Sequence, residues 1–400
     1  MKRTILISLS TILFLIVQAQ WEWQYPEPQG NTLNEIFFAD QLNGWSVGDR
    51  GAIMHTMDGG ETWSMQESGT DLCLKDVIFI NMQQGWAVGD KGTILHTADG
   101  GLSWEAQVSG VLYAPLNGIS FINENIGWII GYKGMILHTT NGGSSWEKHD
   151  YALSDALRSV YFTDEFHGWT LGNNGRYLKT DDGGNTWENR SFEFYHDLYD
   201  IFFTDAENGW IAGEYGLLNS TDGGDTWGVQ NPISTRSLFF HDQYNGWTVG
   251  LEGQIHQTVD GGITWNHQES KTSKSLYDID FGDEDNGWAV GEDGTILYTN
   301  NGGATWISEQ QFMSHTIKTR NYPNPFSNST VLEYQILDAG RVIIRIFNLA
   351  GKEIYKTSID HRTEGTKTYL LPGSTLPAGI NYYQIQYGNR FGTGKMIRIR

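Results

Sequence analysis

Short stretches of alternating apolar and polar residues recur along the chain, and no stretch keeps the spacing of an amphipathic helix. Leu33–Phe38 and Leu198–Phe203 are two such stretches, and a Gly-Trp pair follows each of them six residues later. Another short apolar run, such as Ala52–Thr56, comes after the next turn. Brief alternating runs between glycine-rich turns predict short β-strands, so the pattern favours an all-β protein.

An eight-residue box, Ser/Thr-x-Asp/Asn-Gly-Gly-x-Ser/Thr-Trp, occurs seven times between Thr56 and Trp306. Successive boxes start 38 to 42 residues apart, and a Gly-Trp pair lies 17 or 18 residues before each box tryptophan. Four short strands in each interval, repeated seven times, predict a seven-bladed β-propeller.

The box itself has a structural explanation. Its paired glycines allow the positive φ angles of a tight turn, and its third residue can accept hydrogen bonds from the turn's N–H groups. Because seven equivalent copies cannot form one unique catalytic centre, we expect a structural role for these third residues and burial of the box tryptophans between sheets. The third residues are Asp58, Asp99, Asn141, Asp182, Asp222, Asp260 and Asn301.

Two segments are candidates for the strand that closes the ring of blades. Trp21 precedes Leu33 by 12 residues, as Trp104 precedes Leu116, so the N-terminal segment resembles the fourth strand of a repeat. Residues 306–312 offer the alternative. We favour closure by the N-terminal strand.

Charge divides the 400 residues, whose net charge is −21, into parts of opposite sign. Residues 20–313 carry −30 and residues 314–400 carry +7, which predicts a propeller over 20–313 and a second domain over 317–400. The acidic balance argues against a nucleic-acid partner, because phosphate binding needs a basic surface. Cys73 is the only cysteine, which excludes an intrachain disulfide and a multi-cysteine zinc site.

The N-terminus has the pattern of an export signal. Lys2 and Arg3 precede an apolar run over 4–17, and a small residue follows, so we predict a signal peptide over 1–19 with cleavage between Ala19 and Gln20. As a helix the run is only ~21 Å long, too short for a bilayer core of ~30 Å, and no later segment is long and apolar enough to span a membrane, so no transmembrane segment is expected. The alternative is a short buried helix.

The repeat, Phe-x-Asp followed by Gly-Trp-x-Val-Gly and the box, resembles the Asp-box (BNR) repeats of sialidase-like propellers. It is most similar to the photosystem II stability and assembly factor propellers, and the resemblance covers about residues 20–313. It implies the propeller fold, but it says little about the ligand, because the motif residues are structural.

Residues 317–400 have the alternating strands and length of a small β-sandwich. The motifs Tyr-Pro-Asn-Pro-Phe (322–326), Ile-Phe-Asn-Leu-Ala-Gly (346–351) and Leu-Pro-Ala-Gly (376–379) resemble the type A C-terminal sorting domain of the type IX (Por) secretion system. Asn381 departs from the family's usual Tyr or Val. The resemblance implies that the type IX machinery is a partner and that the chain reaches the cell surface or the medium through the periplasm. An adhesive sandwich module is the alternative.

No candidate for catalysis or metal binding is convincing, so we expect no cofactor, no metal and no catalytic residue. His55, His96 and His138 occupy one repeat position on different blades, and Asp283–Gly287 aligns with a turn of the other repeats. A sialidase site requires several arginines around one carboxylate, and only Arg158 and Arg236 share a suitable position.

The second position of each first strand is a candidate partner site, because a structural position would repeat its residue type and this one varies. The first strands should line the propeller axis, so these residues should form a ring at one mouth. Its basic and aromatic members suit an anionic or carboxylate-bearing partner, although solvated strand starts are the simpler alternative. The candidates are Lys75, Arg158, Tyr199, Arg236 and Tyr277, with Asn34 and Asn117 completing the ring.

Together these observations predict a monomeric, non-catalytic propeller that binds a protein or glycan partner at the cell surface. A sialidase-like glycoside hydrolase and an assembly factor for a surface complex are the alternatives.

Overall fold

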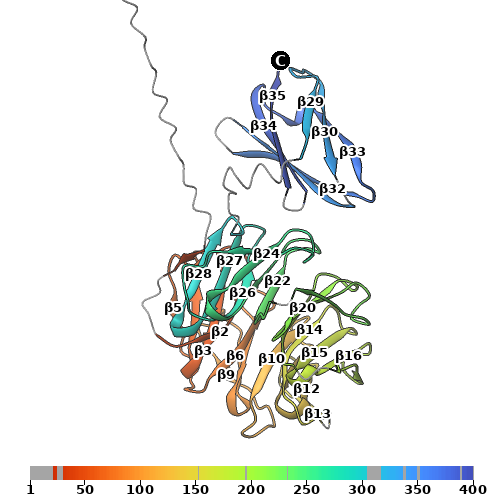
Figure 1. Cartoon of the computed structure of the whole chain (residues 1–400). Coiled ribbons are helices and arrows are strands. Elements are labelled where there is room, and N and C mark those ends of the chain that lie inside the picture. Colours follow the sequence, from red (N-terminus) through yellow and green to blue (C-terminus); the bar gives the residue numbers. More distant parts are fainter. Residues whose placement is uncertain are drawn as a thin grey trace, which may run out of the picture.

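The computed structural model describes residues 21–24, 30–151, 153–193, 196–231, 233–303, 317–336, 339–348, 352–387 and 390–399. The predicted leader with its cleavage site, and the competing closing segment 306–312, lie outside these residues. The fold is all-β, as predicted: seven four-stranded antiparallel sheets form the blades of a propeller, and two further sheets form a C-terminal β-sandwich (Figure 1).

Each blade begins with an innermost strand that pairs with the Gly-Trp strand. The innermost strands are β2 (Leu33–Phe38), β6 (Leu74–Phe79), β10 (Leu116–Phe121), β14 (Leu157–Phe162), β18 (Leu198–Phe203), β22 (Ser237–Phe240) and β26 (Leu276–Phe281). Their partners are β3 (Gly44–Gly48), β7 (Gly85–Gly89), β11 (Gly127–Gly131), β15 (Gly168–Gly172), β19 (Gly209–Gly213), β23 (Gly246–Val249) and β27 (Asn286–Gly291).

The third strand ends at the box, and the fourth strand forms the blade's outer edge. The third strands are β4 (Ile53–Thr56), β8 (Ile94–Thr97), β12 (Met135–Thr139), β16 (Tyr177–Thr180), β20 (Gly216–Ser220), β24 (Ile255–Thr258) and β28 (Ile296–Asn300). The fourth strands are β5 (Ser64–Met65), β9 (Glu105–Ala106), β13 (Glu147–Asp150), β17 (Glu188–Asn189), β21 (Gly228–Asn231), β25 (Asn266–Gln268) and, in the last blade, β1 (Glu22–Trp23).

In six blades a single 3₁₀ turn connects the second strand to the third, with a left-handed residue at its centre, such as Arg50 with φ 57°. These turns are η1 (Asp49–Gly51), η2 (Asp90–Gly92), η3 (Tyr132–Gly134), η4 (Asn173–Gly175), η5 (Leu251–Gly253) and η6 (Glu292–Gly294). They lie at the end of the propeller where the innermost strands begin, because Leu33 pairs with Gly48, next to η1.

The tryptophan of each Gly-Trp strand is fully buried and joins its blade to the next one. Trp45 stacks on Phe79 of the following blade at 3.7 Å between ring centroids, and Trp288 stacks on Phe38 at 3.5 Å, which joins the last blade to the first. The same stack recurs at every blade junction. Phe38, which stacks on Trp288, also requires a glycine at position 44, because a Cβ added there would lie 2.4 Å from the Phe38 ring.

The box forms the turn that we predicted, but its tryptophans are less buried than expected. Trp187 is 8% exposed, whereas most box tryptophans are half-buried and meet the same phenylalanine edge-on, as Trp63 meets Phe38 at 6.0 Å. The deeply buried tryptophans are those of the Gly-Trp strands. The box adds a second joint between blades, since the Gly100 carbonyl accepts hydrogen bonds from Trp45 and Gln66 of the preceding blade.

The N-terminal strand closes the ring, as we favoured. Glu22 pairs with Tyr298 and Trp23 with Leu297. Trp21 is fully buried and meets Phe281 edge-on at 6.0 Å, so it takes the place that a box tryptophan has in the other blades. Its indole N–H donates to Gln268 at 2.8 Å.

The C-terminal domain packs two sheets around an apolar core of its own that includes Leu332, Ile344 and Ile385. One sheet has the order β29-β30-β33 and the other β32-β31-β34-β35. Their bounds are β29 (Thr319–Tyr322), β30 (Ser329–Ile336), β31 (Gly340–Phe347), β32 (Glu353–His361), β33 (Gly365–Pro372), η7 (Gly373–Thr375), β34 (Gly379–Tyr387) and β35 (Arg390–Arg398). The predicted boundary near 314 falls in the segment that the structure does not describe.

Candidate binding mouth

The ring residues lie side by side around one mouth of the propeller, at the end that carries the 3₁₀ turns. Each is the second residue of its innermost strand, except Arg236, which directly precedes β22. Hydrogen bonds connect some of them to the next blade: the Lys75 ammonium donates to Asn117 at 3.1 Å, and the Asn117 amide donates to the carbonyl of Leu157, the residue before Arg158, at 2.7 Å. The positions are therefore close to one another, and their role in partner binding stays a prediction.

Two arginines from different blades lie over one tyrosine ring. The Arg158 guanidinium lies 5.4 Å and the Arg236 guanidinium 4.1 Å from the centroid of the Tyr199 ring. Among the described residues no carboxylate forms an ion pair with Arg236, and its buried Nε has no hydrogen-bond partner. A guanidinium held over an aromatic ring is fixed in position, and it can donate hydrogen bonds to a carboxylate that reaches it.

The 3₁₀ turns and neighbouring loops surround this ring with acids, which the sequence reasoning missed. Lys75 pairs with Asp90 at 3.1 Å and Arg158 with Asp197 at 3.4 Å. The Tyr277 hydroxyl donates to Glu292, and burial together with this carboxylate raises the pKa of Tyr277. The mouth is therefore less basic than its composition suggested, and Arg236 is its one ring cation without an acidic partner among the described residues.

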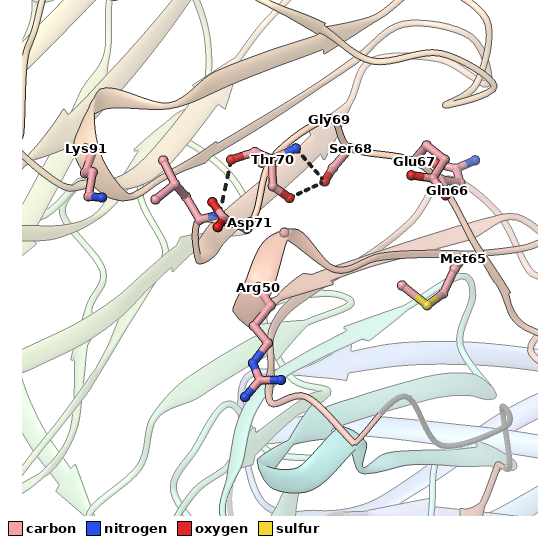
Figure 2. A pocket seen from close by; sticks show the side chains of 11 residues that line it. Arg50, Met65, Gln66, Glu67, Ser68, Gly69, Thr70, Asp71 and Lys91 are labelled. Atoms are coloured by element: carbon pink, nitrogen blue, oxygen red, sulfur yellow. Dashed lines mark hydrogen bonds between the residues drawn. The ribbon is translucent and has the colours of Figure 1, made fainter.

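A cavity of about 670 Å³ lies beside the mouth, between the first two blades. Its wall is the loop 65–72, in which Ser68 and Thr70 hold each other through hydrogen bonds. Figure 2 shows Arg50 and Lys91 on either side of this loop. Both arise from left-handed positions in η1 and η2, so the cavity adds two cations to this end of the propeller.

One position deeper, the innermost strands carry a ring of acids and small residues around the axis. The Asp76 carboxylate accepts a hydrogen bond from the Ile119 N–H of the next blade at 2.7 Å, and Asp278 accepts one from the Ile36 N–H across the ring closure at 2.9 Å. The ring consists of Glu35, Asp76, Gly118, Ser159, Asp200, Ser237 and Asp278. In the sequence, each member of this ring is the third residue of a first strand. The carboxylates of the ring join neighbouring blades.

Confinement among other acids changes the ionisation of this axial ring. Burial raises the pKa of Asp76 to about 7 and that of Asp200 to about 6, with neighbouring carboxylates adding to the effect. Burial and the Asp278 charge raise the pKa of Glu35, whose carboxyl shares a hydrogen bond with Asp278. Protons are therefore held in the axial ring close to neutral pH.

The remaining candidates take structural positions. His55 stacks on Trp45 at 4.5 Å, and His96 and His138 repeat this contact in the next two blades. Asp283 accepts the backbone N–H of Asn286 in a turn between strands, as predicted for 283–287. Within the described part of the chain, no group of three or more His, Cys, Asp or Glu residues could hold a metal ion.

Comparison with known families identifies both domains. A sequence model described as "Photosynthesis system II assembly factor YCF48" matches residues 66–157, 149–235 and 265–330, more than half of the chain. A second, described as "Secretion system C-terminal sorting domain", matches 320–400, and such a domain directs a chain through the type IX system to the cell surface or the medium. No curated protein matches the chain. None of the described helices is long and apolar enough to cross a membrane.

Solved structures show the same fold. "YCF48 bound to D1 peptide" is 24% identical, with a TM-score of 0.61, covering 70% of this chain and 96% of that one. YCF48 from Cyanidioschyzon merolae is 22% identical, with a TM-score of 0.60, covering 70% and 99%. PorZ, a surface component of the type IX secretion system of Porphyromonas gingivalis, is 11% identical, with a TM-score of 0.56, covering 94% and 60%. The chain thus belongs to the family of the photosynthesis system II assembly factor YCF48, and it carries a secretion-system sorting domain after its propeller.

Proposed function

We propose that the chain is a non-catalytic propeller that captures an acidic segment of a partner protein at the mouth defined above. The sorting domain delivers the propeller to the surface, and the mouth holds the partner there. In this role the propeller assists the assembly of a surface complex.

The observation that carries this proposal is Arg236. Its guanidinium carbon lies over the Tyr199 ring, 4.1 Å from the ring centroid, and no described carboxylate pairs with it. Arg158, which also contacts the Tyr199 ring, already donates hydrogen bonds to Asn173 and Asp197. A carboxylate that approaches the mouth therefore finds one preorganised guanidinium, whose planar fork suits bidentate binding.

The axial acids favour a structural role over hydrolysis. A retaining glycosidase separates its two carboxyl groups by about 5–5.5 Å, and an inverting one by more, so that the sugar and water fit between them. Glu35 and Asp278 instead share a hydrogen bond, and Asp278 also holds the Ile36 N–H and the Ser237 hydroxyl. Their oxygens are engaged in joining blades.

A protein partner is favoured over a glycan by the relatives. The family is named for an assembly factor, and one solved YCF48 structure is described as bound to a D1 peptide. The name and the bound peptide belong to the relatives. For this chain they support a peptide segment as the class of ligand.

The test is selection of a displayed library of random nonapeptides on the immobilised chain. We expect enrichment of peptides rich in Asp and Glu, because a carboxylate is the group that Arg236 can bind. Arg236→Gln should abolish the enrichment, and it breaks no ion pair seen in the described structure. Arg190→Gln is the matched control, because Arg190 pairs with Glu188 and Asp225 away from the mouth.

Tryptophan fluorescence and the unfolding midpoint should show that both variants are folded. Enrichment that is unchanged in folded Arg236→Gln protein, or a preference for neutral or basic peptides, would contradict the proposal.

A further inference from the structure

The sandwich touches the propeller through charged side chains on its four-stranded sheet. Arg341 on β31 donates to the Asp242 carboxylate at 2.7 Å, and its guanidinium lies 5.2 Å from the Tyr244 ring centroid. Both charged side chains are about three-quarters buried. Asp242 and Tyr244 belong to the turn between β22 and β23, in the sixth blade.

A second ion pair reaches the seventh blade. Lys356 on β32 pairs with Glu284, in the turn between β26 and β27. Glu284 also lies 3.8 Å from His241, and the positive charge of Arg345 acts on Glu284 and Asp285. Two adjacent blades therefore present acids to basic residues of one sheet.

The outer face of that sheet is covered. Val342 and Ile344 point into the core of the sandwich, so Ile343 between them points outward, opposite Gln386 of β34. Ile343 and Gln386 are nevertheless only 8% exposed. On the other sheet, the outward residues of β33, such as Leu370 at 61%, are exposed to solvent.

We propose that the acidic turns of blades six and seven are a docking site for the chain's own sorting domain. The sorting domain is basic: residues 314–400 carry +7, whereas residues 20–313 carry −30. The electrostatic attraction between the two domains therefore adds to that of the individual ion pairs. The domain docks through its four-stranded sheet and leaves the outer face of the three-stranded sheet free.

The docking site is at the end of the propeller opposite the mouth. Its two turns follow the innermost strands, whereas the ring residues stand where these strands begin. Figure 1 shows the sandwich beyond the ends of the last two blades, near β24 and β27. The docked domain therefore leaves the mouth open, so the chain can bind its partner while it still carries the domain.

A zero-length carbodiimide tests this arrangement in the chain without its predicted signal peptide (residues 20–400), because the reagent joins an ammonium to a carboxylate only where the two are in contact. We expect an amide link between Lys356 and Glu284 at 0.05 M salt. The yield should fall at least threefold at 0.5 M salt, where screening is much stronger. A mixture of ¹⁴N- and ¹⁵N-labelled chains should give no mixed link, because the contact is within one chain.

Charge reversal identifies the contact. Arg341→Glu should lower the yield at least fivefold, and Arg341→Glu combined with Asp242→Arg should restore at least half of it. Asp205→Arg is the matched control, since Asp205 holds Asn208 as Asp242 holds Asn245, with no hydrogen bond to the sandwich among the described residues. Absence of the link in the wild type, mixed-isotope links, or a yield indifferent to Arg341→Glu would overturn the proposal.

Discussion

Asp182 shows how the third box residue stabilises its turn. Its carboxylate accepts hydrogen bonds from the Thr186 N–H at 2.8 Å and from the hydroxyls of Thr180 and Thr186 at 2.9 and 2.6 Å. Removal of these acceptors in Asp182→Ala should lower the free energy of unfolding by about 1–3 kcal/mol. Asp182→Asn should lose much less, because Asn141 in its own box accepts two of the equivalent bonds and donates the third to Ser145.

Urea unfolding of the two variants beside the wild type measures this difference. Equal losses for Asp182→Ala and Asp182→Asn would show that the charge, and not the hydrogen-bonding oxygen, stabilises the turn.

The axial carboxyls predict an unusual pH dependence of stability. Their pKa values in the folded state, about 7 for Asp76 and about 6 for Asp200, exceed the value of about 3.9 for an unfolded aspartate. Between about pH 4 and 7 these two carboxyls therefore bind more protons in the folded chain than in the unfolded one, so their contribution to stability falls as the pH rises through this range. The urea midpoint should be higher at pH 5.5 than at pH 8.

Asp76→Asn should flatten this dependence and stabilise the propeller at pH 8, because an amide needs no proton there. Asp40→Asn is the control. Burial raises the pKa of Asp40, but hydrogen bonds from Asn43 and the backbone outweigh this effect and lower it, so Asp40 titrates below the range of pH 5.5 to 8. An Asp76→Asn protein whose midpoint differs from that of the wild type by the same amount at pH 5.5 and pH 8 would contradict the assigned direction.

At the scale of elements, strand β1 fastens the first residues of the propeller to the last blade. Trp21 is fully buried against Phe281 and bonded to Gln268. Trp21→Ala should cost about 3–5 kcal/mol by the rule for large-to-small substitutions in a core. Glu22→Ala on the same strand should be nearly neutral, because its side chain is exposed. Thermal unfolding of both variants measures this, and a stable Trp21→Ala protein would show that another segment can close the ring.

Elements that repeat could be predicted from the sequence, and contacts between repeats could not. Boxes and Gly-Trp pairs at a fixed period predicted the blades, and the spacing of Trp21 predicted the closing strand. The axial ring was missed because its position varies between acids, serines and a glycine. The ion pair of Lys75 with Asp90 was missed because it depends on how η2 turns back toward the start of β6. Such contacts depend on turn geometry rather than on periodicity.

For the whole molecule, the sorting domain and the propeller are separable in structure. Each has its own core, and no described strand of one pairs with a strand of the other. Removal of residues 317–400 should therefore abolish surface delivery and leave a folded propeller. Surface labelling together with tryptophan fluorescence of the truncated chain measures both, and normal display of that chain would contradict the role of the sorting domain.

The central claim, capture of an acidic protein segment at the mouth, is tested most directly by photocross-linking on living cells. A photoreactive residue replaces Tyr132, an exposed side chain in η3 at the mouth end, or Phe166, an exposed side chain at the opposite end. We predict that Tyr132 yields a protein adduct whose linked peptide is acidic, and that Arg236→Gln removes it, while Phe166 yields no such adduct. Adducts only from Phe166, or a Tyr132 adduct indifferent to Arg236→Gln, would contradict the account.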